Sequence, residues 1–173
     1  MTPLLEQNPD LWFIDETGVR LQTSLRKVVA PRGSKPVVRI RQSKKGIRLI
    51  GAYRKSGRFL LSIVPTVNQE RIKEMLRRIK RLKGQGRFYV VWDGDGSHTA
   101  HSVARLAYKK GIHLIQQPPC TPEVQPVEEI WRRLKRFLAN WLFTDIPHLI
   151  KVVQQFFATH KYHFTFEVAN YFS

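Results

Sequence analysis

The sequence predicts an α/β domain with a mixed sheet that starts with an antiparallel hairpin, continues through parallel crossovers and is flanked by helices. Two patterns support this class. Two strand-like runs flank a short turn, and later a strand, a helix and a second strand follow in succession. With 173 residues, 42% of them hydrophobic, the chain can form one domain with a core but not two full domains. We therefore expect residues 1–173 to form a single domain.

The first predicted elements are strands. Residues 11–14 form an apolar run that leads into Asp15 and Glu16, which is typical of a buried strand ending in acids. Similar runs at 46–53 and 58–64 are separated by a short turn containing glycine. This arrangement predicts an antiparallel hairpin.

A basic helix and a buried strand follow. Apolar residues at helical spacing predict a helix over 69–83. The other face of this helix carries seven cations, which are either solvated or directed at phosphates. The continuous apolar run 88–92 predicts a strand buried on both faces, and it leads into Asp93.

The second half of the chain is richer in helices. We expect a helix over 99–110 and a strand over 112–115, which together with the preceding strand make a right-handed parallel crossover. The proline-rich stretch 116–126 predicts an extended loop. A long amphipathic helix is expected over 127–143, and a last helix over about 146–159.

Positive charge dominates the composition, with 30 Lys and Arg residues against 13 Asp and Glu, a formal net charge of +17. The segment from Arg20 to Arg87 holds 21 of these cations and two acids, a net of +19. Such an excess indicates a polyanionic partner, most often nucleic acid, and suggests one surface built to hold phosphates. Binding through that surface would weaken steeply with salt. The alternative is a generically basic, soluble surface.

Other classes are disfavoured. No apolar run approaches the length of about 18–20 residues that spans a bilayer, and the first residues do not resemble a signal peptide. The single cysteine, Cys120, cannot form an internal disulfide. We therefore expect a cytoplasmic protein without membrane contact.

Three carboxylates stand beside apolar elements in this basic chain. Asp15 and Asp93 follow predicted strands, and Glu128 lies in the first turn of the long helix. A buried charge is costly unless it is paired or holds a metal. Two Asp and one Glu at one edge of a sheet would supply the hard oxygen ligands that Mg²⁺ prefers. Two such ions suit phosphodiester chemistry.

Each carboxylate also has an ordinary interpretation. Asp15 could bond its own loop, and Asp93 could pair with a nearby Lys or Arg. Glu128 could interact favourably with the positive end of the helix dipole and pair with Arg132 four residues on. The residues alone leave these alternatives open.

Three motifs in this order carry a family resemblance: Phe-Ile-Asp-Glu at 13–16, Val-Val-Trp-Asp at 90–93 followed by His98, and Pro-Glu-x-x-Pro-x-Glu-x-x-Trp at 122–131 followed by Lys135. They resemble the DDE catalytic domain of cut-and-paste transposases, in the bacterial insertion sequence 630 branch of the mariner superfamily. The 34 residues between Asp93 and Glu128 match the spacing of that branch.

The resemblance implies a ribonuclease H-like fold in which Asp15, Asp93 and Glu128 are catalytic and bind two Mg²⁺ or Mn²⁺ ions. It further implies cleavage at transposon ends, strand transfer to target DNA, homodimer formation and a place near the nucleoid of a prokaryotic cell. We expect the DNA contacts to include these residues: Arg41, Lys44, Lys45, Arg71, Arg77, Arg78, Arg81 and His98. For His98, a hydrogen bond at a helix start is an equal alternative.

Two positions depart from the family pattern. Gly94 and Gln125 stand where the family usually has Asn. Since Gln is a poor helix N-cap, we expect the helix that carries Glu128 to be held less firmly. Full-length members also carry helix-turn-helix modules ahead of the first Asp. We therefore expect a catalytic fragment, the second product of a split reading frame or a repurposed copy, with a separate N-terminal module recognising the DNA ends.

Two other functions stay open beside transposition. A non-catalytic nucleic-acid-binding module would keep salt-sensitive binding when Asp15, Asp93 and Glu128 are neutralised. Another ribonuclease H-like nuclease, such as a junction resolvase, would prefer branched or hybrid substrates.

Overall fold

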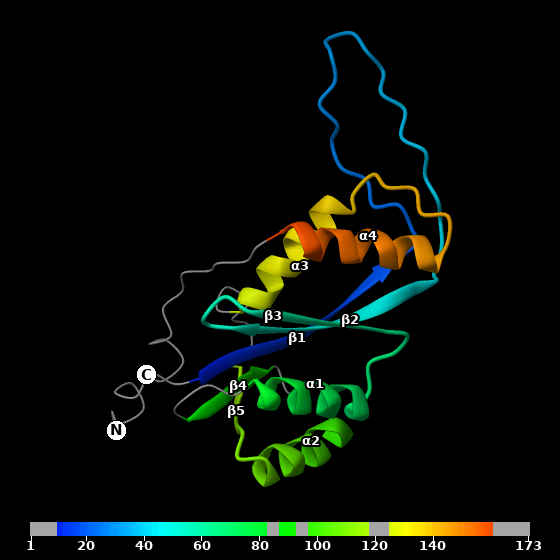
Figure 1. Ribbon diagram of the computed structural model, residues 1–173. Coiled ribbons are helices and arrows are strands. Elements are labelled where there is room, and N and C mark those ends of the chain that lie inside the picture. The colour runs from blue at the N-terminus through cyan, green and yellow to red at the C-terminus, as the bar shows by residue number, and fades with distance from the viewer. Residues whose placement is uncertain (1–9, 83–86, 93–96, 118–124, 161–173) are drawn as a thin grey trace.

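The computed structural model describes residues 10–82, 87–92, 97–117 and 125–160, and of residues 97–100 the backbone alone. Its centre is a five-stranded mixed sheet with the order β3-β2-β1-β4-β5 (Figure 1). The strands are β1 Asp10–Arg20, β2 Gly46–Arg54, β3 Phe59–Val64, β4 Phe88–Trp92 and β5 His113–Gln116. The pairs β1–β2 and β2–β3 are antiparallel, whereas β1–β4 and β4–β5 are parallel. The hairpin start and the parallel crossover predicted from sequence are thereby confirmed.

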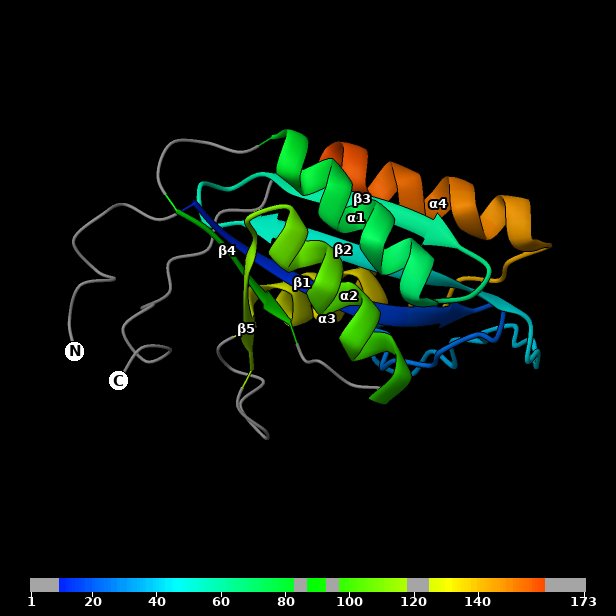
Figure 2. The same cartoon turned by 90° about the horizontal axis from the view of Figure 1, so that it is seen from below.

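Two pairs of helices cover the sheet. Helices α1 (Gln69–Arg81) and α2 (Ser97–Lys109) lie on one face, and α3 (Pro126–Phe137) and α4 (Ile146–Thr159) lie on the other (Figures 1 and 2). None of the helices described here combines the length and the apolar character needed to cross a bilayer.

Strand β1 contributes to the core on both faces of the sheet. Leu11 and Phe13 belong to the cluster beneath α3 and α4, while Trp12 and Ile14 belong to the cluster beneath α1 and α2. Since side chains alternate along a strand, Asp15 faces the same side as Phe13. The core pattern therefore directs Asp15 toward α3.

The first strand is longer than the sequence indicates. It continues to Arg20, whose partner is Gly46, so that Asp15 lies within the strand rather than at its end. The prediction of a strand that stops at the acids was wrong. The reason is that pairing with β2 continues past Asp15 and supplies the backbone with hydrogen-bond partners there.

The long helix is shorter than expected. It ends at Phe137 instead of residue 143, and Asn140 three residues on adopts a left-handed backbone with φ 63°. Asn tolerates this conformation better than most residues, and its backbone N–H donates to the carbonyl of Ser24 at 2.8 Å. Trp141 therefore belongs to the loop before α4, which Asp145 caps through the N–H of His148 at 2.8 Å. The predicted proline-rich loop lies largely outside the described residues.

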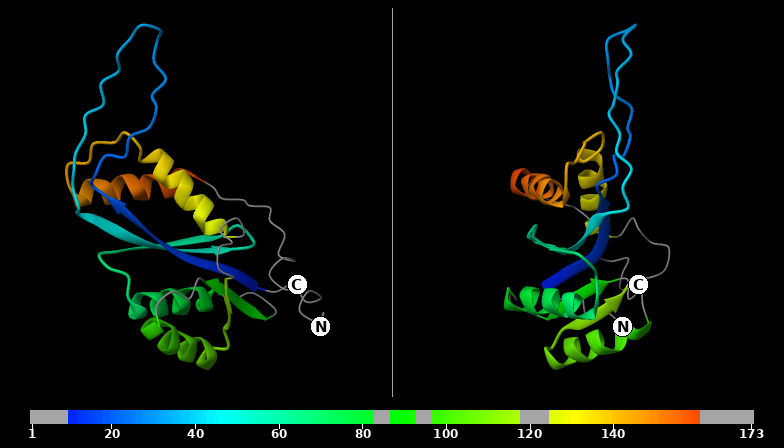
Figure 3. Two further views of the ribbon diagram at one scale, coloured as in Figure 1. Left: turned by 180° about the vertical axis from the view of Figure 1, so that it is seen from behind. Right: turned by 90° about the vertical axis from the view of Figure 1, so that its right-hand side faces the viewer.

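A long arm joins β1 to β2. We define the arm as residues 21–45, which leave the sheet beyond the α3–α4 end and return to it (Figure 3). At its base, the N–H of Leu21 donates to the carbonyl of Lys45, and the N–H of Thr23 donates to that of Arg41. No apolar pattern in the sequence predicts this arm.

Candidate active site

Asp15 is half-buried in the central strand of the sheet. Its Oδ2 accepts a hydrogen bond of 3.0 Å from Nε1 of Trp131, a residue of α3 that is 3% exposed. A hydrogen bond to a carboxylate is among the stronger kinds, so it restricts the orientation of the Asp15 side chain. Sequence reasoning placed Trp131 in the family motif and in the core, but it missed this contact with Asp15.

Gly51 makes room for this contact. It is the β2 partner of Asp15 in the antiparallel ladder. A Cβ at Gly51 would lie 2.6 Å from Cζ2 of Trp131 and 2.8 Å from Cζ of Phe59. Only glycine therefore lets the indole ring lie over β2 beside Asp15. The glycine inside a strand pattern was the available signal, because it marks close approach of another group.

Gln125 fastens the start of α3 to the sheet. As predicted, its side chain makes no capping hydrogen bond to the helix. Instead, Nε2 donates to the carbonyl of Ile14 at 3.4 Å and to Oε1 of Gln117 at 3.2 Å. Gln125 is 3% exposed, and its own Oε1 has no hydrogen-bond partner among the described residues. The departure from Asn thus replaces a cap with a tether to β1.

Glu128 lies between these two attachments on α3. It follows Gln125 by three residues and precedes Trp131 by three, and it is exposed in the first turn. Residues three apart share a helix face, and the two neighbours of Glu128 on this face contact Ile14 and Asp15. The fold therefore brings the face of Glu128 to the part of β1 that carries Asp15.

The adjacent carboxylate has a different environment. Arg132 and Arg133 both pair with Glu129, the latter at 2.8 Å. Burial raises the pKa of the Glu129 carboxyl, but hydrogen bonds from Arg133 and Arg132 outweigh burial and hold that pKa below its ordinary value of 4.5. Glu129 thus stabilises α3 on its surface.

Asp93, Gly94 and the side chain of His98 lie outside the described residues, so their roles stay predictions. Asp93 directly follows Trp92, the last residue of β4. In the parallel ladder Phe13 is paired with Val91, and Asp15 and Asp93 each come two residues later in the sequence. Among the described residues, which do not include Asp93, no three His, Cys, Asp or Glu side chains lie close enough together to hold a metal ion.

The structure divides the predicted DNA contacts into two groups. Arg41, Lys44 and Lys45 belong to the arm, whereas the four arginines of α1 lie on the opposite side of the sheet from α3 and α4 (Figure 1). The arm and α1 thus lie on different parts of the molecule, and phosphate binding by either one stays a prediction.

Several of these cations already have partners. The Arg41 guanidinium donates to the carbonyls of Phe143 and Thr144. On α1, Arg71 pairs with Glu74, and Arg78 donates to Oγ of Ser62. Each of these arginines has a structural contact that competes with phosphate binding.

The exposed cations outside these contacts form a separate set. On α1 these are Arg77 and Arg81, since the exposed Arg71 pairs with Glu74, and at the base of the arm they are Lys44 and Lys45. They lie on two different parts of the molecule and are the members of the predicted set best placed to meet phosphates.

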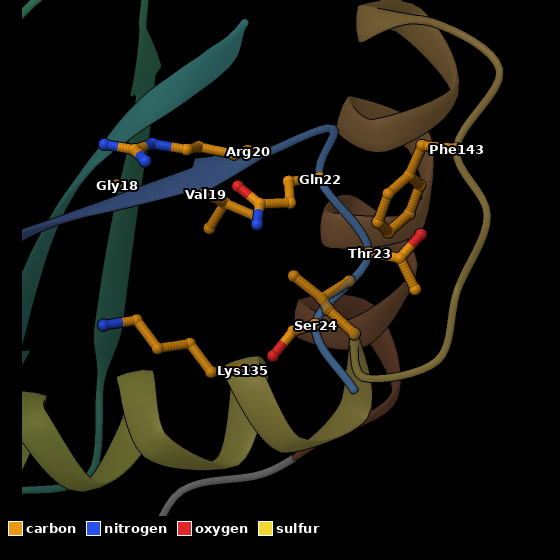
Figure 4. A pocket seen from close by; sticks show the side chains of 9 residues that line it. Gly18, Val19, Arg20, Gln22, Thr23, Ser24, Lys135 and Phe143 are labelled. Atoms are coloured by element: carbon orange, nitrogen blue, oxygen red, sulfur yellow. The ribbon is translucent and has the colours of Figure 1, made fainter. Parts of the chain in front are cut away.

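A cavity of about 280 Å³ lies beyond Asp15 along the same face of the sheet. It is formed by the end of β1, the start of the arm and the second half of α3. Figure 4 shows Lys135 reaching from α3 toward β1, with Arg20 and Gln22 on the opposite wall. Lys135 is seven residues, about two helical turns, after Glu128. The cavity is thus a basic continuation of the candidate site.

Comparisons with known proteins bear on this arrangement. A family model described as DDE superfamily endonuclease matches residues 10–150. The chain is 32% identical over 84 residues to the transposable element Tc1 transposase of Caenorhabditis elegans, a match covering 48% of this chain and 31% of that protein. It is 29% identical over 90 residues to the uncharacterized protein y4pE/y4sA of Sinorhizobium fredii, covering 51% and 64%. The chain thus spans less than two thirds of each relative.

Solved structures share the fold. The catalytic domain of Mos1 mariner transposase superposes with a TM-score of 0.63 at 19% identity, covering 88% of this chain and 71% of that one. The Mos1 mariner paired end complex with Mn gives a TM-score of 0.70 at 19% identity, covering 88% and 49%. The mixed sheet flanked by helices is the ribonuclease H-like arrangement that the motifs implied, and that prediction is confirmed.

Proposed function

The chain belongs to the DDE superfamily of endonucleases, and we propose that it is a transposase catalytic domain that cuts DNA at transposon ends and joins them to target DNA. The family match over residues 10–150 includes Asp15, Asp93 and Glu128. The match to the Tc1 transposase supports transposition as the activity.

One observation carries the proposal: α3 is attached to β1 on both sides of Glu128. Gln125 contacts Ile14, and Trp131 contacts Asp15. A helix held in this way keeps the Glu128 face beside the Asp15 carboxylate. Two carboxylates fixed on rigid elements make the kind of preorganised site that catalysis requires.

The donor set fits a divalent metal ion. Asp15 is half-buried with one oxygen held by Trp131, and Glu128 is exposed at the edge of the site. Carboxylate oxygens with room for water are the ligands that Mg²⁺ and Mn²⁺ prefer. When bound, such ions activate a nucleophile and neutralise charge on the scissile phosphate. Solved Mos1 complexes with Mn and with Mg support this choice of metal.

The proposal includes finer assignments. It places the chain in the insertion sequence 630 branch, as one catalytic domain acting in a prokaryotic nucleoid. It also assigns end recognition to an additional DNA-binding module and assembly to a homodimer on paired ends. Solved Mos1 complexes with transposon ends support DNA as the partner.

A non-catalytic DNA-binding module with the same fold is the second candidate. Gln125 favours it, because its side chain does not cap α3 and its buried Oε1 has no partner in the described part of the chain. A buried polar atom of this kind usually costs about 1–3 kcal/mol. The helix that carries Glu128 would then be anchored for stability rather than for chemistry.

Nicking of supercoiled plasmid in Mg²⁺ or Mn²⁺ tests catalysis. We expect metal-dependent nicking by the wild type and none by Asp15→Asn or Glu128→Gln. Asn can still accept the hydrogen bond from Trp131, so Asp15→Asn removes the charge and keeps the contact. Asp145→Asn is the matched control, because Asn caps α4 as well as Asp does. Wild-type nicking by both site variants would rule out the assigned carboxylates.

A Mn²⁺ titration followed by NMR tests the metal site without activity. The Trp131 indole N–H lies against Asp15, so its signal should broaden first among the tryptophan indoles. Asp15→Asn should abolish that broadening, while Asp145→Asn should not. If the Trp131 signal stays sharp at millimolar Mn²⁺ in the wild type, the non-catalytic module becomes the better interpretation.

A further inference from the structure

The arm carries a larger net positive charge than any helix or strand that the structure describes. Its 25 residues contain eight Lys and Arg residues and no acid. It also exposes apolar side chains, with Val29 fully exposed and Val37 90% exposed. The arm projects away from the sheet and the helices (Figure 3). A segment of this composition cannot form its own core, and its lack of acids disfavours pairing with itself.

The base of the arm is fixed, and so is the direction in which it leaves. Oδ1 of Asn140 accepts from the N–H of Arg26 at 2.9 Å, and Nδ2 of Asn140 donates to the Arg26 carbonyl at 3.2 Å. On the returning limb, Arg41 donates to the carbonyls of Phe143 and Thr144. Both limbs are therefore fastened to the loop that follows α3.

The tip is a tight turn that displays two cations. The N–H and the hydroxyl of Ser34 both donate to the carbonyl of Pro31, at 3.0 and 2.7 Å. Gly33 has φ +88°, as the third position of a type II turn requires. Arg32 within the turn and Lys35 just after it are exposed. Pro31 at the first position of this turn and Pro36 after Lys35 limit the backbone freedom of the tip, so the two cations are presented at little cost in entropy.

The limbs are single extended segments. Beyond Thr23 and Arg41, no backbone hydrogen bond joins one limb of the arm to the other. The arm is therefore not a two-stranded β-ribbon, which is the form that fits the DNA major groove. Extended basic segments instead enter the minor groove, which is about 6 Å wide. The groove narrows over A·T tracts, where its negative potential attracts arginine.

We propose that the tip of the arm, through Arg32 and Lys35, binds the minor groove of duplex DNA and prefers A·T-rich sequence. The choice of DNA as partner rests on the proposed function. Arg32 follows Asp15 by 17 residues, a reach of at most about 56 Å at about 3.3 Å per residue. At about 3.4 Å per base pair, the contact lies within about 16 base pairs of a phosphate held at Asp15. The exposed valines then lie against the sugar walls of the groove.

Binding of the full chain to A·T-rich and G·C-rich duplexes of equal length, in EDTA, tests the proposal. We expect the wild type to bind the A·T-rich duplex several-fold more tightly, and a minor-groove ligand such as netropsin to compete. Arg32→Ala with Lys35→Ala should lower affinity for the A·T-rich duplex about tenfold and remove the preference. The salt dependence of log K should become shallower by about 2.

Arg105→Ala with Lys109→Ala on α2 is the charge-matched control, since both residues are exposed and lie on the opposite side of the sheet from α3. It should retain the A·T preference. Unchanged affinity of the arm variant for both duplexes would overturn the proposal. So would an arm variant that changes the oligomeric state in sedimentation while DNA binding stays the same, because the arm would then contact protein.

The outcome is independent of catalysis. The binding assay contains EDTA, so metal-dependent cleavage does not take place in it. Failure of the nicking assay with an intact A·T preference would therefore count against the active site alone. If the wild type nicks DNA but shows no preference for the A·T-rich duplex, the result would count against the proposed role of the arm alone.

Discussion

The site on β1 and the arm are neighbours in sequence but are positioned by different forces. Asp15 is held by a side chain that is itself packed in the core, with Gly51 leaving space for the Trp131 ring. The arm is held at its base, by hydrogen bonds between Asn140 and Arg26, by those of the Arg41 guanidinium, and by the backbone bonds of Leu21 and Thr23. We therefore expect the addition of a single methyl group to disturb the site. The arm should instead be sensitive to loss of its anchoring hydrogen bonds and of its charge.

The largest expected effect is loss of the side chain that couples the site to the core. Trp131 is buried against Phe59 and Phe157. We expect Trp131→Ala to lower the free energy of unfolding by about 3–5 kcal/mol, measured by chemical denaturation. Trp131→Phe keeps most of the packing and should cost about 1.5–3 kcal/mol through the lost hydrogen bond to Asp15. Equal losses for both variants would mean that the hydrogen bond, not the packing, dominates.

Two glycines provide the sharpest contrast between the regions. Gly51→Ala forces its Cβ against Trp131 and Phe59, which should cost about 1–3 kcal/mol and weaken Mn²⁺ binding at Asp15. Gly33→Ala meets nothing within 4 Å but must adopt φ +88°. Its strain of about 1–2 kcal/mol should distort the tip and reduce the A·T preference, while global unfolding shifts by less than about 0.5 kcal/mol. A large loss of global stability in Gly33→Ala would contradict this difference between the two regions.

A smaller effect is expected at the base of the arm. Asn140→Gly keeps the left-handed backbone at φ 63° and removes both side-chain hydrogen bonds to Arg26. We expect a loss of about 0.5–1.5 kcal/mol in local stability, seen as faster hydrogen exchange of the Arg26 amide. The Asp15 site should keep its Mn²⁺ affinity. Weaker Mn²⁺ binding in this variant would show that the two regions are coupled.

The smallest effect concerns pH and the surface of α3. The pKa of Glu129 is lowered in the folded state, so its contribution is present above the unfolded pKa and is lost as pH falls through the folded pKa. Glu129→Gln should cost up to about 1 kcal/mol at pH 7. In thermal unfolding, the gap between variant and wild type should narrow below pH 4.5 and close at lower pH. A gap that is constant from pH 7 to pH 3 would contradict this account.

Local periodicity sufficed to predict most of the fold. The strands of the hairpin, α1, β4 and α4 follow from apolar spacing and turn residues, because these signals lie within each element. The end of α3 did not follow, because the backbone of Asn140 is fixed by a carbonyl of the arm far away in sequence. The apolar pattern of α3, taken by itself, continues into the loop that follows this helix.

The carboxylates of the candidate site could be predicted from the sequence, but the contacts that hold them in place could not. Asp15 and Glu128 could be named from acids beside apolar elements and from the motifs. The partnership of Asp15 with Trp131 spans 116 residues, and no local pattern encodes it. The arm was missed for the same reason, since Arg41 finds its acceptors 102 and 103 residues away.

The arm also has an evolutionary consequence, because it begins and ends at adjacent strands that are already hydrogen-bonded to each other. A loop between such fixed ends changes stability slowly with length, by about 0.6 kcal/mol for each doubling. Insertions and deletions at the tip therefore cost the fold little, provided that Leu21 and Lys45 at the base of the arm keep their backbone hydrogen bond. Related chains can vary the reach of this segment along a duplex almost independently of the sheet that carries Asp15.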